Sequence, residues 1–322
     1  MLIDVTHRLM PQQQQERNLA KPGLVLPFYQ AFAASAVAAC TGEIATMPID
    51  TVKVRLQLQG TSQSQTVKYK GTLSTLVTVA RQEGVMSLYK GLVPGLHRQV
   101  LLGGVRIAAY APIRDYYASL LHEQPGHTSI PTKIAAALSA GTLAVLVGNP
   151  TDVLKCRMQA QGKPAPGVPA KYPSALAAYR IIARQEGIKA LWTGTTPNIA
   201  RNSVVNAAEL ATYDQIKEVL MHSFGLNDDI YCHLSASLCA GFLAVTAGSP
   251  FDVIKSRCMV LSAKGDYRGV GHVVMQTLRL EGPLAFWSGY GANFARLSIW
   301  NVCMFLTLEQ LRKLLGAAQT AH

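Results

Sequence analysis

The chain has 322 residues, of which 49% are hydrophobic and 15% are charged, and its formal net charge is +12. Ordinary soluble domains carry roughly 25% charged residues, so this composition favours a membrane protein. The positive charge fits nucleic acid, anionic lipid or an anionic substrate as partner. Because the sequence has no basic patch interleaved with aromatic residues, it predicts no nucleic-acid partner.

The first 27 residues resemble neither of the common targeting segments. They lack the apolar core of a signal peptide and the Arg-rich, acid-poor make-up of a transit peptide. We expect residues 1–27 to be a flexible tail, with targeting information inside the body of the chain.

Three segments come nearest to membrane-spanning helices, at residues 28–47, 134–149 and 231–249. Each is rich in Ala, Gly, Ser and Thr. Small residues let helices approach closely, and polar residues within a span usually face a bundle interior or a water-filled cavity. These segments therefore predict a helical bundle around water.

A repeat of about 100 residues organises the chain. Pro48, Pro150 and Pro250 lie 102 and 100 residues apart, a period that fits three copies of one large unit. Each copy predicts a long helix, a short amphipathic helix ending at Glu-Gly, and a second long helix after an aromatic-x-Gly triplet. Two spanning helices per copy give six. We place the copies at residues 28–125, 126–226 and 227–316, with a tail at 317–322.

An acidic and a basic residue follow each proline at fixed spacing. The pairs are Asp50 and Lys53, Asp152 and Lys155, and Asp252 and Lys255. Residues three apart share one helix face. Where three such helices meet, the charges can pair between neighbours and close a ring, which would act as a gate. The alternative is snorkelling charges at the membrane edge, but three copies in one register favour the ring.

Three arginines occupy equivalent places on the second helices: Arg98, Arg201 and Arg296 each follow the glycine of an aromatic-x-Gly triplet by seven residues. At 1.5 Å per residue they lie about 10 Å into each helix, and hence at one level. Guanidinium groups suit carboxylate and phosphate, so these residues predict an anion site. Snorkelling to an interface or bracing a kink is the alternative.

Charge is distributed unevenly between the connections. Residues 57–91 carry a net charge of +3 and residues 161–193 a net charge of +4, whereas the short connections contain Glu123, Asp228 and Asp229. This asymmetry is typical of a protein fixed across a membrane.

The remaining motifs exclude other classes. The six cysteines, Cys40, Cys156, Cys232, Cys239, Cys258 and Cys303, show no paired spacing and predict neither disulfides nor a metal site. The sequence has no phosphate-binding loop, metalloprotease motif or nucleophile elbow, so we expect no enzyme. A structural scaffold would not need three arginines at one depth.

The triplicated Pro-x-Asp-x-x-Lys motif resembles that of the mitochondrial carrier family over residues 28–316. The segments "GLVPGLHRQVLLGGVRIAAY", "LWTGTTPNIARNSVVNAAELATYDQIKE" and "ARLSIWNVCMFLTLEQLRK" resemble its uncoupling proteins, particularly the plant type. The resemblance implies an all-α membrane protein: six transmembrane helices in three pseudo-symmetric repeats around a central cavity, with short matrix helices. It also implies multi-pass localisation in the mitochondrial inner membrane, alternating access, and cardiolipin as a structural lipid at the matrix face.

The resemblance also implies two gates. A glutamine often braces the matrix ring, and Gln57 and Gln159 occupy that position, whereas the third copy has Met259. The cytosolic network of the family is matched by Asp214 with Lys217, and less closely by Glu309 with Arg312, because Leu308 replaces an aromatic residue. In the first copy Ala111 stands where an acid is expected, so Arg114 lacks a partner in register and we expect a weak cytosolic gate.

Further residues are candidates for the substrate site. In uncoupling proteins three arginines at these places bind purine nucleotides. Asn202, directly after Arg201, resembles the residue at this place in carriers of carboxylates more than that in nucleotide carriers. Arg106 and Glu209 resemble a charged pair of uncoupling proteins, which is either structural or a substrate contact. Trp300 either walls the cavity or packs in the core.

Glu43 lies seven residues before Asp50 and so on much the same helix face. Uncoupling proteins have an acid here. Burial would favour its protonated form and let it carry a proton, or it is a permanent counter-ion of the arginines. The histidine pair linked to proton transport in the brown-fat form is missing, because the corresponding loop reads "AQGKPAPG".

We therefore predict an anion carrier of the uncoupling type that exchanges aspartate, glutamate, malate, oxaloacetate or phosphate, with a fatty-acid-activated, purine-nucleotide-inhibited proton leak. A weak cytosolic gate could link the two activities. The alternatives are a dedicated proton uncoupler and a different carboxylate carrier of the family. No metal or other cofactor is expected. No apolar outer face stands out from lipid-facing surface, so oligomeric state stays open and a monomer is the prediction.

Overall fold

The computed structural model describes residues 28–59, 69, 71–123, 128–163, 167–223, 230–264, 267 and 269–320. The expected tail at residues 1–27 lies outside this part of the chain. Every regular element among the described residues is helical, as the sequence predicts.

The elements repeat three times in the predicted order. The long helices are α2 (Phe28–Leu58), α4 (Leu92–Leu120), α5 (Ile130–Ala160), α7 (Thr195–Ser223), α8 (Ile230–Leu261) and α10 (Tyr290–Thr320). The short helices are α3 (Thr72–Glu83), α6 (Ala175–Gln185) and α9 (Val270–Glu281), followed by the 3-10 turns η1 (Val85–Tyr89), η2 (Ile188–Trp192) and η4 (Pro283–Trp287); η3 (Ser262–Lys264) extends α8. Helix α10 continues to Thr320, past residue 316, where we expected the last repeat to end.

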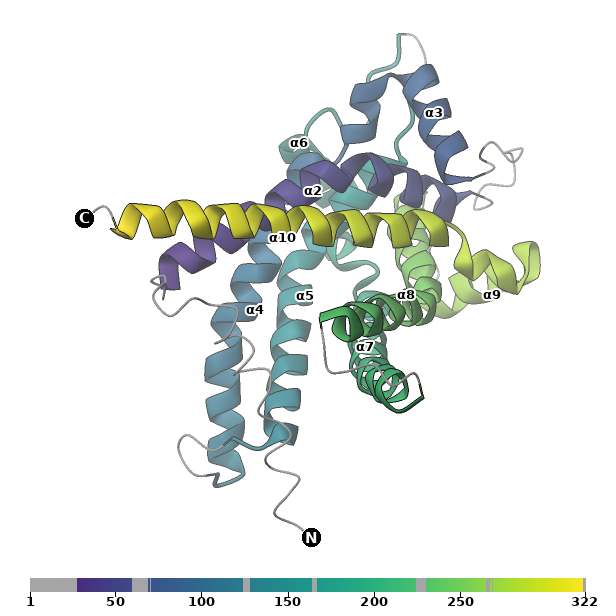
Figure 1. Cartoon of the computed structure of the whole chain (residues 1–322). Coiled ribbons are helices and arrows are strands. Elements are labelled where there is room, and N and C mark those ends of the chain that lie inside the picture. The colour runs from purple at the N-terminus through teal and green to yellow at the C-terminus, as the bar shows by residue number, and fades with distance from the viewer. Residues whose placement is uncertain are drawn as a thin grey trace.

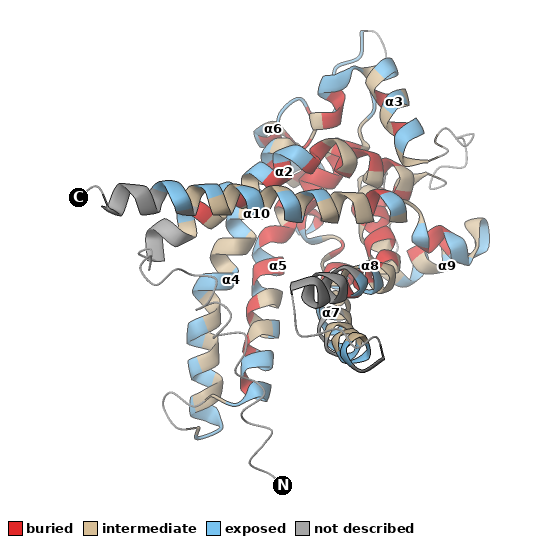
Figure 2. Ribbon diagram, in the orientation of Figure 1, coloured by how far each residue is buried: buried red, intermediate tan, exposed pale blue. Residues whose placement is uncertain are grey.

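The long helices form a closed circuit. The most extensive helix contacts join α4 to α5, α7 to α8 and α10 to α2, so the second helix of each repeat packs on the first helix of the next. Helices α2, α5 and α8 also contact one another. Figure 1 shows the pairs α2/α10 and α4/α5 extending in different directions from this convergence, with the short helices around it. Buried residues gather at the convergence (Figure 2).

Each proline lies inside a continuous helix, where it leaves the carbonyl four residues earlier without its usual backbone donor. In two repeats a tryptophan supplies the missing hydrogen bond. Trp192 Nε1 donates to the Leu146 carbonyl at 2.9 Å, and Trp287 Nε1 donates to the Thr246 carbonyl at 3.3 Å. In these two repeats the aromatic residue of the triplet therefore satisfies the backbone carbonyl that the proline leaves open.

The glycine of this triplet permits a close helix crossing. Gly91 has φ 89°, and a Cβ atom there would lie 3.1 Å from the backbone oxygen of Lys155. The equivalent Gly194 and Gly289 face the backbone oxygens of Lys255 and Lys53 at 3.4 and 3.2 Å. The second helices thus begin directly against the lysines of the ring motif.

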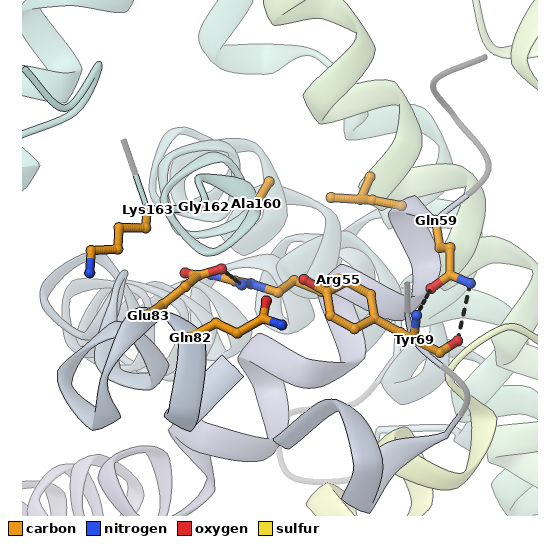
Figure 3. Close-up of a pocket in the computed structure, with 9 residues that line it drawn as sticks. Arg55, Gln59, Tyr69, Gln82, Glu83, Ala160, Gly162 and Lys163 are labelled. Carbon is orange, nitrogen blue, oxygen red and sulfur yellow. Dashed lines mark hydrogen bonds and ion pairs between the residues drawn. The ribbon is translucent and has the colours of Figure 1, made fainter. Parts of the chain in front are cut away.

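Buried arginines anchor the short helices. Arg55, two residues after Lys53, binds Glu83 through Nη1 and Nη2 at 2.5 and 2.8 Å. Its third guanidinium nitrogen, Nε, donates across the repeat boundary to the Gln159 carbonyl at 3.2 Å. Arg55, Glu83 and Gly162 line a cavity of about 330 Å³. Figure 3 shows the residues around it. The same arrangement recurs as Arg157 with Glu186 and Arg257 with Glu281.

Two of the described helices combine the length and the apolar composition of a membrane span, at Phe32–Leu58 and Ile130–Ala160. All six predicted spanning segments are present as long helices, but this criterion selects only those two.

Candidate functional site

The three acid–base pairs expected from the repeat motif are present where α2, α5 and α8 converge. Lys53 Nζ lies 3.0 Å from Asp252 Oδ2, Lys255 Nζ lies 2.7 Å from Asp152 Oδ2, and Lys155 binds Asp50. Each pair joins two repeats. Snorkelling does not describe these side chains, because they are between 5% and 18% exposed and each faces a partner. We call these six residues the charged ring.

Two asparagines support the charged ring. Asn198 donates from Nδ2 to Asp152 at 2.9 Å and accepts from Lys255 at 3.0 Å, so it bridges one ion pair. Asn293 donates to Asp252 at 2.9 Å. The sequence analysis missed both, although each follows the glycine of an aromatic-x-Gly triplet by four residues. The signal was incomplete, because the first repeat has Gly95 there.

The two glutamines that we expected to brace the charged ring differ from the asparagines in their hydrogen bonds. Gln57 and Gln159 are buried next to the charged ring. Gln159 Nε2 lies 3.8 Å from the sulfur of Met47. Within the described part of the chain, the side-chain amides that hydrogen-bond the ring are those of Asn198 and Asn293 and of neither glutamine, so bracing by glutamine stays a prediction.

Arg98, Arg201 and Arg296, called the cavity arginines below, lie directly against the charged ring and line one pocket with it. Arg98 Nε is 2.5 Å from Asp152 Oδ1, and Arg201 Nε is 3.2 Å from Asp252 Oδ1. Arg296 forms the equivalent ion pair with Asp50. Each arginine binds an aspartate of the next repeat. The arrangement therefore places three guanidinium groups where an anion in the cavity would meet the ring.

Glu43 lies beside the arginines, fully buried. Its carboxylate oxygens lie 2.5 Å from Lys155 Nζ, 2.7 Å from Gln99 Nε2 and 3.8 Å from Arg296 Nη2. Two cations and an amide donor stabilise a negative charge. These contacts favour the counter-ion alternative for Glu43 over the proton carrier.

A cavity of about 420 Å³ reaches one of these arginines, Arg98. It is lined by the predicted Arg98, Arg106, Asn202 and Trp300, and also by Asn206, which the sequence analysis missed. Trp300 both walls the cavity and packs on α2, because a Cβ atom at Gly42 would lie 3.0 Å from its ring. The side chain of Glu209 lies outside the described residues, so its pairing with Arg106 stays a prediction.

The predicted cytosolic network falls partly outside the described residues, since the side chains of Asp214 and Arg312 are not among them. Glu309 binds Lys313 at 2.7 Å on the same helix. Arg114 binds the neighbouring Asp115 at 2.7 Å, so its acidic partner comes from the next position in the chain. The pairing of Asp214 with Lys217 stays a prediction.

Comparison with known proteins agrees with the three repeats. Residues 25–120, 126–224 and 227–319 each match the family described as mitochondrial carrier protein. The chain is 50% identical to mitochondrial uncoupling protein 1 of Arabidopsis thaliana over 296 residues. The aligned residues make up 91% of this chain and 95% of that relative. It is 43% identical over 289 residues to the putative mitochondrial transporter UCP3 of Mus musculus (89% and 92% covered), and 42% identical over 294 residues to the dicarboxylate carrier UCP2 of Danio rerio (89% and 93% covered). Members of this family are transporters of the mitochondrial inner membrane, the predicted localisation. The chain belongs to the mitochondrial carrier protein family and is of the uncoupling-protein type.

Proposed function

We propose that the protein exchanges small dicarboxylates and acidic amino acids across the mitochondrial inner membrane by alternating access, through six transmembrane helices around the cavity. The observation that carries this proposal is the contact between the three cavity arginines and the three aspartates of the charged ring. A substrate carboxylate is chemically the same group as these aspartates, so it can take their place on the arginines.

The net charge of the site supports a divalent substrate. The six cations are the three ring lysines and the three arginines, and the four carboxylates are the ring aspartates and Glu43. Among the side chains described at this level, two positive charges therefore remain in excess. In a site of low dielectric constant, such an excess favours a dianion of matching charge.

The charged ring would act as the matrix gate. Its ion pairs join all three repeats, and closing it would block the path where α2, α5 and α8 converge. When substrate carboxylates draw the arginines from the ring aspartates, they remove contacts that hold neighbouring repeats together. The substrate shifts the equilibrium between the closed and the open gate by the difference between its binding free energies to these two states.

The relatives support the same substrate class. One of them is named a dicarboxylate carrier. Asn202, which follows Arg201, lines the cavity and accepts a hydrogen bond from that arginine at 3.2 Å. An amide beside a guanidinium offers a second donor to a carboxylate.

A fatty-acid-activated, purine-nucleotide-inhibited proton leak is the second proposed activity, favoured by the uncoupling-protein names of other relatives. Glu43 is the proposed proton-linked group, because the other two repeats have valine at this position; its contacts with Lys155 and Arg296 make a permanent counter-ion the competing role. A dedicated proton uncoupler without metabolite exchange is the alternative. We further propose cardiolipin as a structural lipid at the matrix face and a monomer as the functional unit.

The test uses purified protein in liposomes. Uptake of labelled aspartate, malate and phosphate is measured with and without internal counter-substrate, beside proton flux with and without fatty acid and GDP. Rapid uptake that requires counter-substrate and is lost in Arg201→Ala would support the exchanger. Nucleotide-sensitive proton flux without solute exchange would refute it in favour of the dedicated uncoupler.

A further inference from the structure

The first repeat departs from the other two at two positions near the charged ring. Seven residues before the ring aspartate, the second and third repeats have Val145 and Val245, but the first has Glu43. Four residues after the glycine of the aromatic-x-Gly triplet they have Asn198 and Asn293, but the first has Gly95. One departure adds a carboxylate and the other removes an amide.

These two departures meet in space, although one lies on α2 and the other on α4. A Cβ atom built on Gly95 would lie 2.7 Å from Glu43 Oε1 and 3.5 Å from its carboxyl carbon. Atoms at 2.7 Å without a hydrogen bond between them overlap, so a side chain at position 95 and the observed carboxylate exclude each other. The carboxylate of Glu43 occupies the space that an asparagine side chain would need.

Glu43 reproduces one of the two contacts that the asparagine of the second repeat makes, the one to the ring lysine. In the second repeat, Asn198 Oδ1 accepts from the ring lysine Lys255 at 3.0 Å. In the first repeat, Glu43 Oε1 accepts from the ring lysine Lys155 at 2.5 Å. The other oxygen of Glu43 accepts from Gln99 at 2.7 Å, which fixes the plane of the carboxylate.

We infer that Glu43 and Gly95 are a matched pair, in which a carboxylate replaces the amide brace of one ion pair of the charged ring and Gly95 makes the room for it. Glu43 is thus a positioning residue for Lys155. The inference deepens the proposed function, since the ring it supports is the proposed matrix gate.

Because a carboxylate takes the place of an amide in the first repeat, the ring lysines differ in their hydrogen-bond acceptors. Lys155 lies between two acids, Asp50 and Glu43, whereas Lys255 lies between one acid and one amide. A hydrogen bond to a charged acceptor is stronger than one to a neutral acceptor. Lys155 therefore has two charged acceptors, whereas its aspartate, Asp50, lacks the asparagine donor that Asp152 and Asp252 have.

The test is a swap that gives the first repeat the residues of the other two. Thermal unfolding in detergent is compared for the wild type, Gly95→Asn, Glu43→Val and the double variant. We expect Gly95→Asn to lower the Tm in the presence of Glu43 and to raise it in the Glu43→Val background, where the amide regains its space and can accept from Lys155. Gly103→Asn is the matched control. It lies on the same helix, and a Cβ atom there meets nothing within 4 Å, so its effect should have one sign in both backgrounds.

Helix propensity alone would make Gly95→Asn favourable in both backgrounds, because glycine is the poorer helix former. An effect of the same sign in both backgrounds would therefore overturn the inference. If Gly95→Asn does not yield folded protein, Gly95→Ala presents the same Cβ contact with less bulk and is compared in the same two backgrounds.

A second readout separates the gate from mere stability. In liposomes, the ratio of malate uptake with internal malate to uptake without it should fall several-fold in Glu43→Val and recover in the double variant. A ratio equal in Glu43→Val and the double variant would contradict a role at the gate. If the wild type exchanges no dicarboxylate, the proposed function fails, while the Tm comparison still decides whether Glu43 and Gly95 are matched.

Discussion

Arg98 Nε lies 2.5 Å from Oδ1 of Asp152, so an arginine on α4 holds the first helix of the next repeat through an aspartate of the charged ring. Arg201 and Arg296 make the same connection at the other two boundaries. The proposed substrate site and the proposed gate thus share their side chains. An anion that binds the arginines competes with the gate aspartates, which gives binding a direct physical route to gate opening.

The first prediction concerns Arg98. Replacing Arg98 by Gln should lower malate exchange by about tenfold or more, because a hydrogen bond to a charged group contributes about 1.5–3 kcal/mol. Arg98→Lys keeps the positive charge but cannot form the paired hydrogen bonds that a guanidinium makes to a carboxylate, so the loss of exchange should be smaller than in Arg98→Gln. Initial uptake rates in liposomes measure both. The control is Arg180→Gln on the short helix α6, where exchange should be unchanged; an equal loss in Arg180→Gln and Arg98→Gln would contradict the prediction.

The second prediction compares the two members of one ion pair. Asp252 accepts from Lys53 at 3.0 Å and from Asn293 at 2.9 Å, and Arg201 lies 3.2 Å away. Asp252→Asn leaves two cations without their acid, which should cost about 3–5 kcal/mol. Lys53→Gln leaves Asp252 with Arg201, so it should cost less. Thermal unfolding in detergent measures the order, and a larger loss of Tm in Lys53→Gln would refute this account of the ring.

Repetition decides how much of this site is predictable from the sequence. The ring pairs and the three arginines recur three times at fixed spacing, and helix periodicity then places them on one face and at one depth. Asn198 and Asn293 occur in only two repeats, so their pattern was incomplete. Arg55, Arg157 and Arg257 do recur three times, but their partners lie at the end of the short helix and across the repeat boundary, and spacing along one helix does not reveal either.

For Glu43 the sequence predicts the position of the side chain but not its role. Its position seven residues before Asp50 correctly predicts that it lies on the face of α2 that carries the ring aspartate. Its partners Lys155 and Arg296 come from the other two repeats. Whether a buried acid carries a proton or serves as a counter-ion depends on those partners, and only the packed bundle supplies them.

The third prediction concerns pH and the anchor of α3. Burial by itself would raise the pKa of Glu83, but hydrogen bonds from Arg55 and Ser87 outweigh it and hold the pKa below the ordinary value of 4.5. A carboxyl group with a lowered pKa stabilises the fold fully above its ordinary pKa and loses this contribution as the pH falls below it. The contribution of Glu83 should therefore be present at pH 7 and decline below pH 4.5.

Glu83→Gln should accordingly lower the Tm at pH 7, and the difference from the wild type should shrink as the pH falls from 4.5 toward 3, by about the amount that protonation removes. Thermal unfolding across this range measures the difference. Glu218→Gln, at an exposed acid on α7, is the control and should leave the Tm nearly unchanged. A difference for Glu83→Gln that stays constant with pH would show that the ion pair with Arg55 contributes nothing.

The last prediction concerns the cytosolic gate. Ala111 stands where the family pattern has an acid, and Arg114, on the same face of α4, binds the exposed Asp115 instead. Ala111→Asp would give this position the missing acid. Since an exposed ion pair contributes at most about 1 kcal/mol, basal proton conductance should fall by up to about fivefold. Conductance is measured in liposomes against Ala111→Asn, which has the same size without the charge, in protein of equal Tm. Equal conductance of these two variants would show that the proton leak does not depend on the strength of this gate.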